Sequence, residues 1–554
     1  MMWNWMKNRK TGGPLSGSPM PEPRIVVPSL YIEDILSGKQ LSTGIEENLK
    51  LLQDVLQYND DLTVRRFQLF EGTSAALVFF SSFVDLEMIR SYLIKPLMTH
   101  TEQEDLIVDA ESLASYLTEK VVQVSRISEE KAPDRIIDEL TMGVTALLVD
   151  GIAAAFLADT RKIEKRSIEQ PQTEQVIRGP REGFIEHLQT NLALIRYRLQ
   201  TPDFRVHTMH IGRVTKSKVA LCYIQGITHP ALVHEAKKRL SAIDTDSILD
   251  AGYIEQFIED HPLSPFPQIQ NTERPDKTVA ALVEGKFVIM VDGSPFALIA
   301  PTVFSQFYQT VDDYTERFLI GSMIRFIRLV ALLFSLVFPS LYVAVISFNP
   351  EVIPTDFAVA VAGSRAGVPY PAMIEVLLME ISMEVLREAT IRLPQLIGGA
   401  LSIVGVLVIG QAAVSAGFSS PITVVIIAMT TVGSFATPAY NAAIALRMLR
   451  FPLVVLAGSF GLYGIMFGMI LITNHLLSIR SFGVPYMTPI TPFNAQEWKD
   501  TLLRGPIWWM SDRPGHLKSL RTKRRKHTDR YYRSPSYSWD KVPQDPDQGG
   551  APDE

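Results

Sequence analysis

The sequence has a single cysteine, Cys222, and lacks the common motifs of nucleotide-binding and hydrolytic enzymes. One cysteine excludes an intramolecular disulfide and any cysteine-rich zinc site. The chain contains no G-x-x-x-x-G-K-S/T phosphate loop, no H-E-x-x-H and no G-x-S-x-G. The ten histidines are scattered, and His207 and His210 are too isolated to form a metal site. We therefore predict no enzymatic turnover and no bound cofactor or metal.

The N-terminus lacks the apolar segment of a signal peptide, because Met1–Pro19 holds tryptophans and basic residues before a Gly/Pro/Ser stretch. A soluble N-terminal part would then stay in the cytoplasm. The formal net charge of −6 gives no sign of a nucleic-acid partner.

Long apolar runs are confined to the part of the chain that follows about Ile327. A bilayer needs about 20 apolar residues per crossing helix, and four runs meet that need. They are Arg328–Phe348, Leu396–Ala416, Pro421–Thr437 and Leu453–Leu476. Four spans put both chain ends on one side, and the nine Lys/Arg between Arg513 and Arg533 place that side in the cytoplasm. Arg447 and Arg450 violate this arrangement, because four spans leave them outside.

A fifth run, Ala372–Ile391, is apolar but carries four glutamates. Facing lipid, they would cost roughly 10 kcal/mol, so we predict an interfacial, re-entrant or vestibule helix. Glu380, Glu384 and Glu388 share one face, and Glu375 points to the other side. Two interpretations of that face stay open. In the first, Arg387 and Arg392 form ion pairs with the glutamates within the helix. In the second, several copies assemble an acidic vestibule that concentrates cations.

Small residues form packing stripes on two of the predicted spans. Gly398, Ser402 and Gly405 line one face of Leu396–Ala416, and Gly464 and Gly468 belong to a similar seam on the last span.

A second face of Leu396–Ala416 carries Val404, Val408, Gln411 and Ser415. The polar pair has no reason to face lipid. It indicates either hydrogen bonds inside the bundle or the lining of a pore with the valines as a constriction.

The part before the apolar runs predicts an α/β fold of two subdomains, 30–165 and 166–320, without an internal repeat. A capping box at Thr43 and Glu46 opens a helix to about Tyr58, and another helix starts near Glu182. Three hairpins are predicted: Ala146–Leu157 with its Asp-Gly turn, Arg205–Gln225, and Phe287–Pro301. Arg178 and Arg181 sit before the second helix, where they form either an anion-binding or coupling turn or a solvated helix entry.

Between about Leu30 and Leu517 the sequence closely resembles the A subunits of GerA-type spore germinant receptors. Several long motifs occur in the order that this family has. They are Glu169–Glu186, Asn191–Arg196, Asp292–Pro301, Asp313-Tyr314, Arg387-Glu388, Gly410–Val414, Pro438–Asn441 and Arg447–Phe451.

The resemblance implies a multi-pass protein of the spore inner membrane with its N-terminal domain, and its C-terminal tail, on the core side. It implies two partners, a transporter-like B subunit and a lipoprotein C subunit. It also implies a homo-oligomeric ring that conducts monovalent cations when a nutrient binds. A non-conducting scaffold or signal coupler, and a related sporulation channel, remain alternatives. A secondary transporter fits least, because no inverted repeat is visible.

The fold class is thus an α/β cytoplasmic region joined to an all-α multi-pass transmembrane bundle. The predicted divisions are a disordered segment 1–29, the two subdomains, a membrane domain 321–480, a membrane-proximal segment 481–517 and a disordered basic and Pro-rich tail 518–554.

Overall fold

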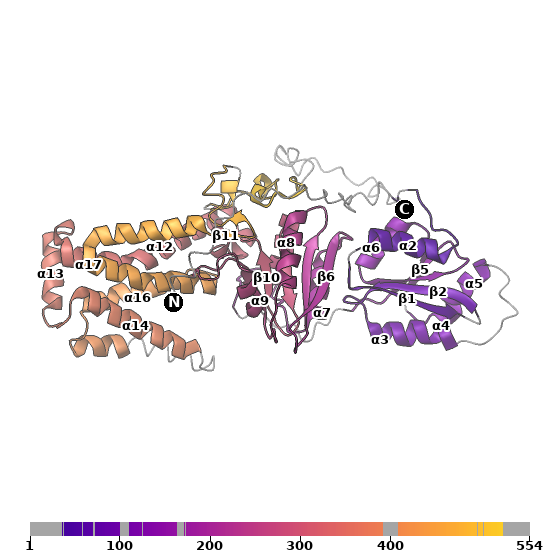
Figure 1. Cartoon of the computed structure of the whole chain (residues 1–554), viewed down its shortest axis with the longest axis horizontal. Helices are drawn as coiled ribbons and strands as arrows, with labels where there is room; N and C mark the ends of the chain where they lie inside the picture. The colour runs from indigo at the N-terminus through magenta and orange to yellow at the C-terminus, as the bar shows by residue number, and fades with distance from the viewer. Residues whose placement is uncertain are drawn as a thin grey trace, which may run out of the picture.

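The computed structural model describes residues 36, 38–57, 59–69, 72–99, 110–124, 126–162, 171, 173–391, 408–495, 497–501 and 503–524. They form three bodies in a row: a first α/β subdomain, a second α/β subdomain and an elongated helix bundle (Figure 1). We call the bundle end beside the second subdomain the near end and the opposite end the far end. The predicted fold class, an α/β region followed by a helical one, is confirmed.

The first subdomain is built on a five-stranded antiparallel sheet with helices on both faces. Its strand order is β1 (Leu62–Leu69), β2 (Thr73–Phe80), β4 (Val144–Val149), β5 (Ala155–Asp159), β3 (Ile127–Glu130). One face packs on α2 (Ile45–Val55) and α6 (Pro133–Thr141). The other packs on α3 (Leu86–Met88), η4 (Ile89–Ile94), α4 (Lys95–Thr99), α5 (Ala110–Tyr116) and η6 (Leu117–Val121).

The second subdomain has the same three layers. Its strand order is β6 (Phe204–Ile211), β7 (Ser217–Ile224), β9 (Phe287–Val291), β10 (Ala297–Ala300), β8 (Gln270–Thr272). Helices α7 (Leu188–Arg198) and α10 (Pro275–Glu284) cover one face, and α8 (Pro230–Ser241) and α9 (Ala251–Ile258) cover the other.

The two subdomains repeat one topology, since the strands of each lie in the order first, second, fourth, fifth, third. The Asp-Gly turn between the last two strands repeats a contact: Asp150 accepts the first N–H of α2 at 3.1 Å, and Asp292 that of α7 at 3.0 Å. One turn into these helices, Asn48 and Asn191 each bond the backbone that precedes the helix. The prediction of no internal repeat is therefore wrong.

The three predicted hairpins are confirmed as β4–β5, β6–β7 and β9–β10. Two predicted helix starts are wrong. The first helix is capped by Gly44 without a side-chain hydrogen bond, because Asp150 from the neighbouring turn supplies the acceptor. The second begins at Leu188, six residues after Glu182.

A buried ion pair joins the two subdomains. Arg196 of α7 donates from Nη2 and Nε to the carboxylate of Asp61 at 2.7 and 2.8 Å, and both side chains are buried. The guanidinium also lies 4.0 Å from the centre of the Phe80 ring and 5.0 Å from that of Phe204.

Cys222 lies in the core of the second subdomain, so a maleimide is expected to spare it in the native protein and to label one thiol after unfolding. Burial, and next the carboxylate of Asp61, raise the pKa of the thiol, so the reactive thiolate is scarce. Mass spectrometry of the full-length protein after brief labelling measures this. A cysteine introduced at Val214, which is 77% exposed, is the control. Equal labelling rates at the two sites would contradict the burial.

The connection into the bundle is short: η7 (Phe304–Phe307) and α11 (Asp312–Thr315) follow β10. Helix α12 (Phe318–Phe348) then runs from the near end to the far end, where η8 (Pro350–Val352) and α13 (Thr355–Arg365) lie across the bundle (Figure 1).

Three helical segments follow α13. Helix α14 (Ala372–Ile391) returns toward the near end, residues 408–415 run to the far end, and α16 (Pro421–Phe435) returns again. Contacts with α12 fix the direction of α16: Thr423 donates to the Tyr342 hydroxyl, and Gly433 lies beside Ala331.

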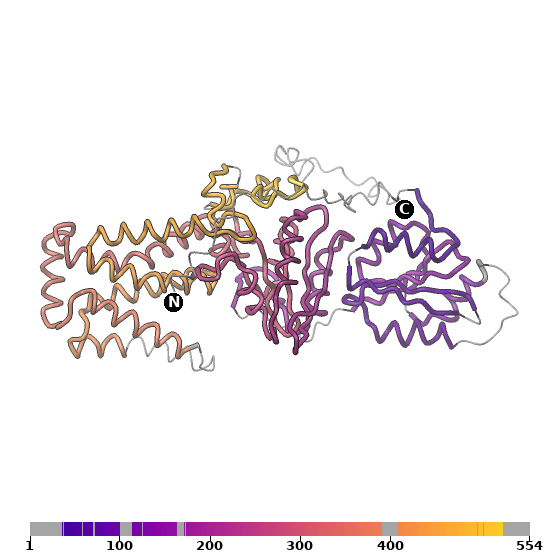
Figure 2. Tube along the Cα trace, in the orientation of Figure 1, coloured from indigo at the N-terminus to yellow at the C-terminus, as the bar shows by residue number. Residues whose placement is uncertain are grey.

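Helix α17 (Tyr440–Ser478) is a helical hairpin. Its Gly461 has φ 61° and ψ −140°, a conformation that only glycine adopts readily. Gly464 lies against the backbone of Leu456, although eight residues of an uninterrupted helix would separate them by about 12 Å. The first arm therefore runs to the far end, where Gly461 lies beside Phe348, and the second arm returns (Figure 2).

The described bundle thus has six lengthwise helical passages, where the sequence predicted four. The two numbers differ because α14 belongs to the bundle and because the predicted span Leu453–Leu476 contains the turn at Gly461; the number of membrane spans stays a prediction. Helix α12 is long and apolar enough to cross a membrane, and so is α17 if its two arms are counted together. Six passages also keep both ends of the bundle at the near end.

The segment after α17 returns to the second subdomain. It contains β11 (Arg480–Ser481), β12 (Val484–Pro485), η9 (Glu497–Lys499), η10 (Ile507–Trp509) and η11 (Gly515–Leu517). Arg513 donates to the carbonyl of Val283 at 2.7 Å, and Ser519 to that of Glu284 at 2.9 Å. The contact continues to Arg524, which donates to the carboxylate of Glu284 at 3.1 Å and lies six residues beyond 518, the predicted start of the tail.

Candidate functional site

The glutamates of α14 face the interior of the bundle. Glu380 accepts two hydrogen bonds from Nη1 of Arg450 on α17, at 3.0 and 2.8 Å. The exposed fractions of the two side chains are 8% and 3%. Around them pack the apolar side chains of Val376 and Val454, which are fully buried. A charge inside an apolar bundle persists when it is paired, so α14 can lie among the other helices without exposing Glu380 to lipid.

Glu384 lies one turn further along α14 and contacts two arginines. Its Oε2 is 3.0 Å from Nη1 of Arg387 and 3.5 Å from Nε of Arg447. Arg387 also reaches Ser434 of α16, at 3.4 Å, and the ring of Phe435. This interface, the charged ladder, therefore ties α14 to both α16 and α17.

Among the described residues, the charged ladder joins arginines of α14 and α17 to glutamates of α14. Three arginines, Arg387, Arg447 and Arg450, meet the two glutamates Glu380 and Glu384. Within the part of the chain that the structure describes, Nε and Nη2 of Arg450 are buried without a hydrogen-bond partner, and Nε of Arg447 has only the 3.5 Å ion pair with Glu384. Unbonded buried donors cost free energy, so the observed ladder is only partly satisfied.

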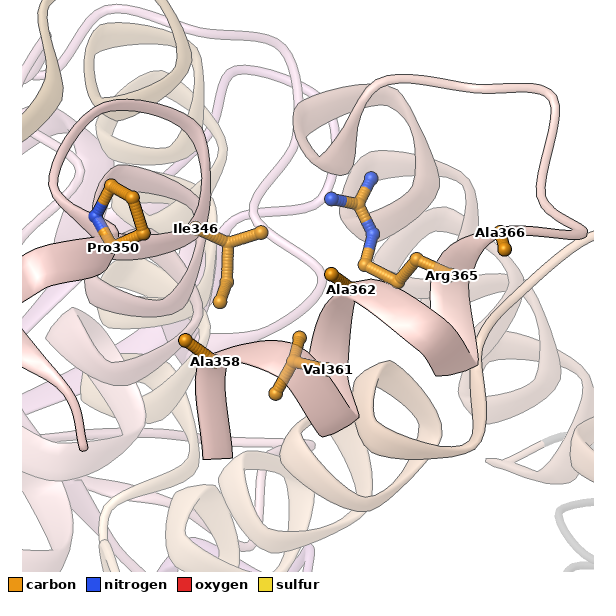
Figure 3. A pocket seen from close by; sticks show the side chains of 7 residues that line it. All are labelled: Ile346, Pro350, Ala358, Val361, Ala362, Arg365 and Ala366. Carbon is orange, nitrogen blue, oxygen red and sulfur yellow. The ribbon is translucent and has the colours of Figure 1, made fainter. Parts of the chain in front are cut away.

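The far end of α14 is held by Glu375. Its Oε1 accepts the backbone N–H of Ser420 at 2.7 Å and the hydroxyl of Ser419 at 3.2 Å, and its Oε2 accepts Nε of Arg365 at 3.1 Å. Arg365 also lines a small cavity of about 320 Å³ between α12 and α13, whose other walls include Ile346 and Val361 (Figure 3).

The interfacial, re-entrant or vestibule position of α14 stays a prediction, but two of its glutamates pair with arginines of α17 instead of facing lipid or water. The predicted ion pair of Arg387 with Glu384 is confirmed, while Arg392 lies outside the described residues. Of the predicted acidic vestibule, Glu380 and Glu384 form ion pairs within the chain, and Glu388 is exposed.

The predicted pore-lining face is described in part. Val404 lies outside the described residues, Val408 is 57% exposed, and Gln411 and Ser415 are also exposed. A polar pair at the surface of an apolar bundle is costly in lipid, which is the reason this face was singled out.

The predicted packing seams have a mixed outcome. Gly398, Ser402 and Gly405 lie outside the described residues. Gly464 and Gly468 are buried where the arms of the α17 hairpin meet.

The predicted anion-binding turn is not at a helix start. Arg178 and Arg181 are exposed, and α7 begins only at Leu188. A carboxylate of the same chain occupies the turn: Oδ1 of Asp312 accepts the N–H of Ile177 at 3.2 Å and that of Arg178 at 3.3 Å. This loop of the second subdomain thus contacts α11, directly before the bundle.

A second charged cluster closes the near end, and sequence reasoning missed it. Arg325 of α12 is fully buried and donates to Asp313 of α11 at 3.2 Å and to Asp500 of the C-terminal segment at 2.9 Å. Arg328 donates to Asp313 at 2.8 Å. Burial raises the pKa of Asp500, although the charge and the hydrogen bond of Arg325 act to lower it. At Asp313 burial acts in the same direction, but the hydrogen bond from Arg328 and the two arginine charges prevail and lower its pKa.

Comparison with known proteins finds relatives over most of the chain. The family model described as Bacillus/Clostridium GerA spore germination protein matches residues 50–516. The chain belongs to the GerA family of spore germination proteins. The resemblance to GerA-type germinant receptor A subunits is thereby confirmed.

Curated members of the GerA family are similar over most of their length. Spore germination protein KA of Bacillus subtilis (strain 168) is 42% identical over 491 residues, 88% of this chain and 89% of its own. Spore germination protein GerLA of Bacillus cereus is 40% identical over 88% of this chain and 99% of its own. A crystal structure of the N-terminal domain of the A subunit of the Bacillus megaterium spore germinant receptor GerK3 is 35% identical, with a TM-score of 0.38, and matches 48% of this chain and 98% of that one.

Proposed function

We propose that the protein is the A subunit of a nutrient germinant receptor and forms, as an oligomer, an ion channel that releases monovalent cations when germination starts. It would lie in the spore inner membrane with both α/β subdomains and the C-terminal segment on the core side. Its partners would be a transporter-like B subunit and a lipoprotein C subunit. Membership of the GerA family and the apolar helices α12 and α17 support this assignment.

The observation that carries the channel is the exposed polar face of residues 408–415. Gln411 and Ser415 follow Val408 at three- and four-residue spacing, and all three side chains are exposed in the single chain. Lipid is a poor environment for an amide and a hydroxyl, whereas a water-filled conduit between several copies would satisfy them. Exposed Val408 would then form the narrow apolar gate.

The near-end cluster favours a second candidate, a coupler without conduction. Arg325 joins α12, α11 and the C-terminal segment in one buried contact, and Asp312 joins α11 to the loop of Arg178. A displacement of the second subdomain would be transmitted to the bundle along these contacts. In this function another subunit would conduct the ions.

Potassium release from spores distinguishes the two functions. Val408→Ala and Val404→Ala are expected to cause leak before nutrient addition, or faster release after it, because a wider and less apolar constriction holds water more easily. Val432→Ala, the same change at a 71% exposed valine of α16, is the matched control. Release like that of the control in both variants, at equal protein levels, would refute the gate and favour the coupler.

A further inference from the structure

We propose that the C-terminal segment and the start of α12 form one surface that inserts into the lipid headgroup layer at the near end of the bundle. Its members, which we call the apolar patch, are five exposed apolar side chains: Leu319, Met323, Leu503, Ile507 and Trp509. The inference rests on the proposed membrane location of the bundle. It does not depend on ion conduction, and it gives the C-terminal segment a binding partner, the lipid surface.

Two contacts join the C-terminal segment to the first turns of α12. The ring of Trp508 meets that of Phe318 edge to face, with 6.0 Å between the ring centroids. Ser322 donates its hydroxyl to the carbonyl of Arg504 at 2.7 Å and accepts the N–H of Arg504 at 3.0 Å. Each residue of the apolar patch is adjacent in the sequence to one of these four contact residues. The two elements therefore carry the patch side by side.

Both elements bury their charged side chains and expose their apolar ones. Arg325 of α12 is fully buried, whereas Leu319 and Met323 are 69% and 66% exposed. In the C-terminal segment Arg504 is 5% exposed and Trp509 57%. Water favours the reverse distribution. Paired charges inside and apolar side chains outside are typical of a protein surface that lipid surrounds.

The apolar patch continues along the outer face of α12. Five exposed residues follow one another on this helix at spacings of four and three: Leu319, Met323, Phe326, Val330 and Leu333. Such spacing places their side chains on one face. Lipid that contacts Val330 and Leu333 would therefore contact the patch as well.

The length of α12 places the patch at the depth of the headgroups. The 31 residues of this helix span about 46 Å. The hydrocarbon core of a bilayer is about 30 Å thick, and the headgroup layers increase this to about 40–45 Å. If residues 328–348 lie in the hydrocarbon core, the first three turns of α12 lie among the headgroups. Tryptophan is enriched at this depth because its ring is apolar and its N–H is polar, which fits Trp508 and Trp509.

The breadth of the exposed apolar surface favours lipid over a second copy of the chain. Ile320, Ile324 and Ile327 are exposed too, on a face of α12 about 100° from that of Leu319 and Met323. Together the two faces cover about half of the helix circumference. A neighbouring helix covers a narrower stripe, whereas lipid contacts every side that the protein leaves open.

Lipid contact at the patch would hold the second subdomain against the membrane. After the patch, the C-terminal segment bonds this subdomain, through Arg513 to the carbonyl of Val283 and through Ser519 to that of Glu284. Because the segment connects the two, a rotation of the second subdomain away from the bundle would have to withdraw the patch from lipid or break these bonds.

Nitroxide labels on single cysteines test the surroundings of the patch. Ile507→Cys is labelled in the full-length protein, reconstituted in vesicles of phosphatidylethanolamine and phosphatidylglycerol. Collisions of the label are measured with oxygen, which concentrates in lipid, and with a water-soluble nickel chelate. The oxygen-to-nickel ratio is expected to be several-fold higher than for Val214→Cys, the matched control on the turn between β6 and β7. Val330→Cys tests the membrane location of α12, and buried Cys222 stays unlabelled.

The three labels distinguish failure of the inference from failure of the proposed function. If Val330→Cys reports lipid and Ile507→Cys resembles Val214→Cys, the patch lies in water and only the inference is refuted. If neither oxygen nor the nickel chelate reaches Ile507→Cys, protein covers the patch, and a second copy or another subunit is the partner instead of lipid. If Val330→Cys itself reports water, the membrane location is refuted as well. Leu503→Cys, with the same expected ratio, replaces Ile507→Cys if that variant does not fold.

Discussion

Replacing Gly464 with alanine is expected to prevent closure of the α17 hairpin and to cause the largest loss of folded protein among single methyl additions in the bundle. An ideal Cβ at this position would overlap the carbonyl oxygen of Leu456 and lie 2.5 Å from its carbonyl carbon. The obstacle is backbone, which no side-chain rotation removes. The two arms must separate along their length, and overpacking of this kind costs about 1–3 kcal/mol or more.

The chain offers graded controls for this prediction. At Gly468 the added methyl group would meet Cδ2 of Leu453 at 2.5 Å, and that flexible side chain can move, so Gly468→Ala is expected to be milder. Gly363 in α13 has open space around it, and Gly363→Ala should leave the protein unchanged or slightly more stable. Thermal midpoints of the detergent-solubilised full-length protein measure the series. Equal midpoints for Gly464→Ala and Gly363→Ala would show that the arms do not meet.

The glycines of α17 show what a local sequence pattern can predict and what it cannot. A G-x-x-x-G spacing predicts close helix packing, and Gly464 and Gly468 do pack closely. The spacing does not tell which helix is the partner, so the turn at Gly461 was missed and one span was predicted where two arms exist. The hairpin turns were predictable because Asp-Gly pairs act within a few residues. The subdomain repeat was not, since Asp150 and Asp292 make their repeated contacts with backbone about 100 residues away.

The charged ladder shows the same limit for polar residues. The free-energy cost predicted for Ala372–Ile391 in lipid assumed that its glutamates have no partners. In the structure Glu380 accepts a hydrogen bond from Arg450, which is 70 residues later in the chain. A signal for this pairing was present. Arg447 and Arg450 violated the four-span arrangement, and their three-residue spacing matches two consecutive rungs of glutamates on an opposing helix. Two unexplained charges of opposite sign in apolar segments predict each other.

The near-end cluster leads to the second large effect: Arg325→Met is expected to destabilise the protein by about 3–5 kcal/mol, because it leaves Asp313 and Asp500 without their shared partner. The Arg325 guanidinium is fully buried, and Asp313 is 1% exposed. Methionine fills most of the space but supplies no donor. Arg328 still neutralises Asp313, so the carboxylate of Asp500 suffers most, and the C-terminal segment should detach from α12 first.

A matched substitution separates this effect from the loss of any arginine. Arg213 forms an ion pair with Asp244 on the surface, with exposed fractions of 69% and 66%, so Arg213→Met should leave the thermal midpoint unchanged. Proteolysis adds a local measure, since cleavage between Asp500 and Arg513 should appear in Arg325→Met below the temperature at which the subdomains unfold. A double variant, Arg325→Met with Asp500→Asn, should regain part of the lost midpoint, because the amide removes the unpaired charge. If Arg325→Met and Arg213→Met have equal thermal midpoints, packing alone holds α12, α11 and the C-terminal segment together. The proposed coupling of the second subdomain to the bundle would then have to use other contacts.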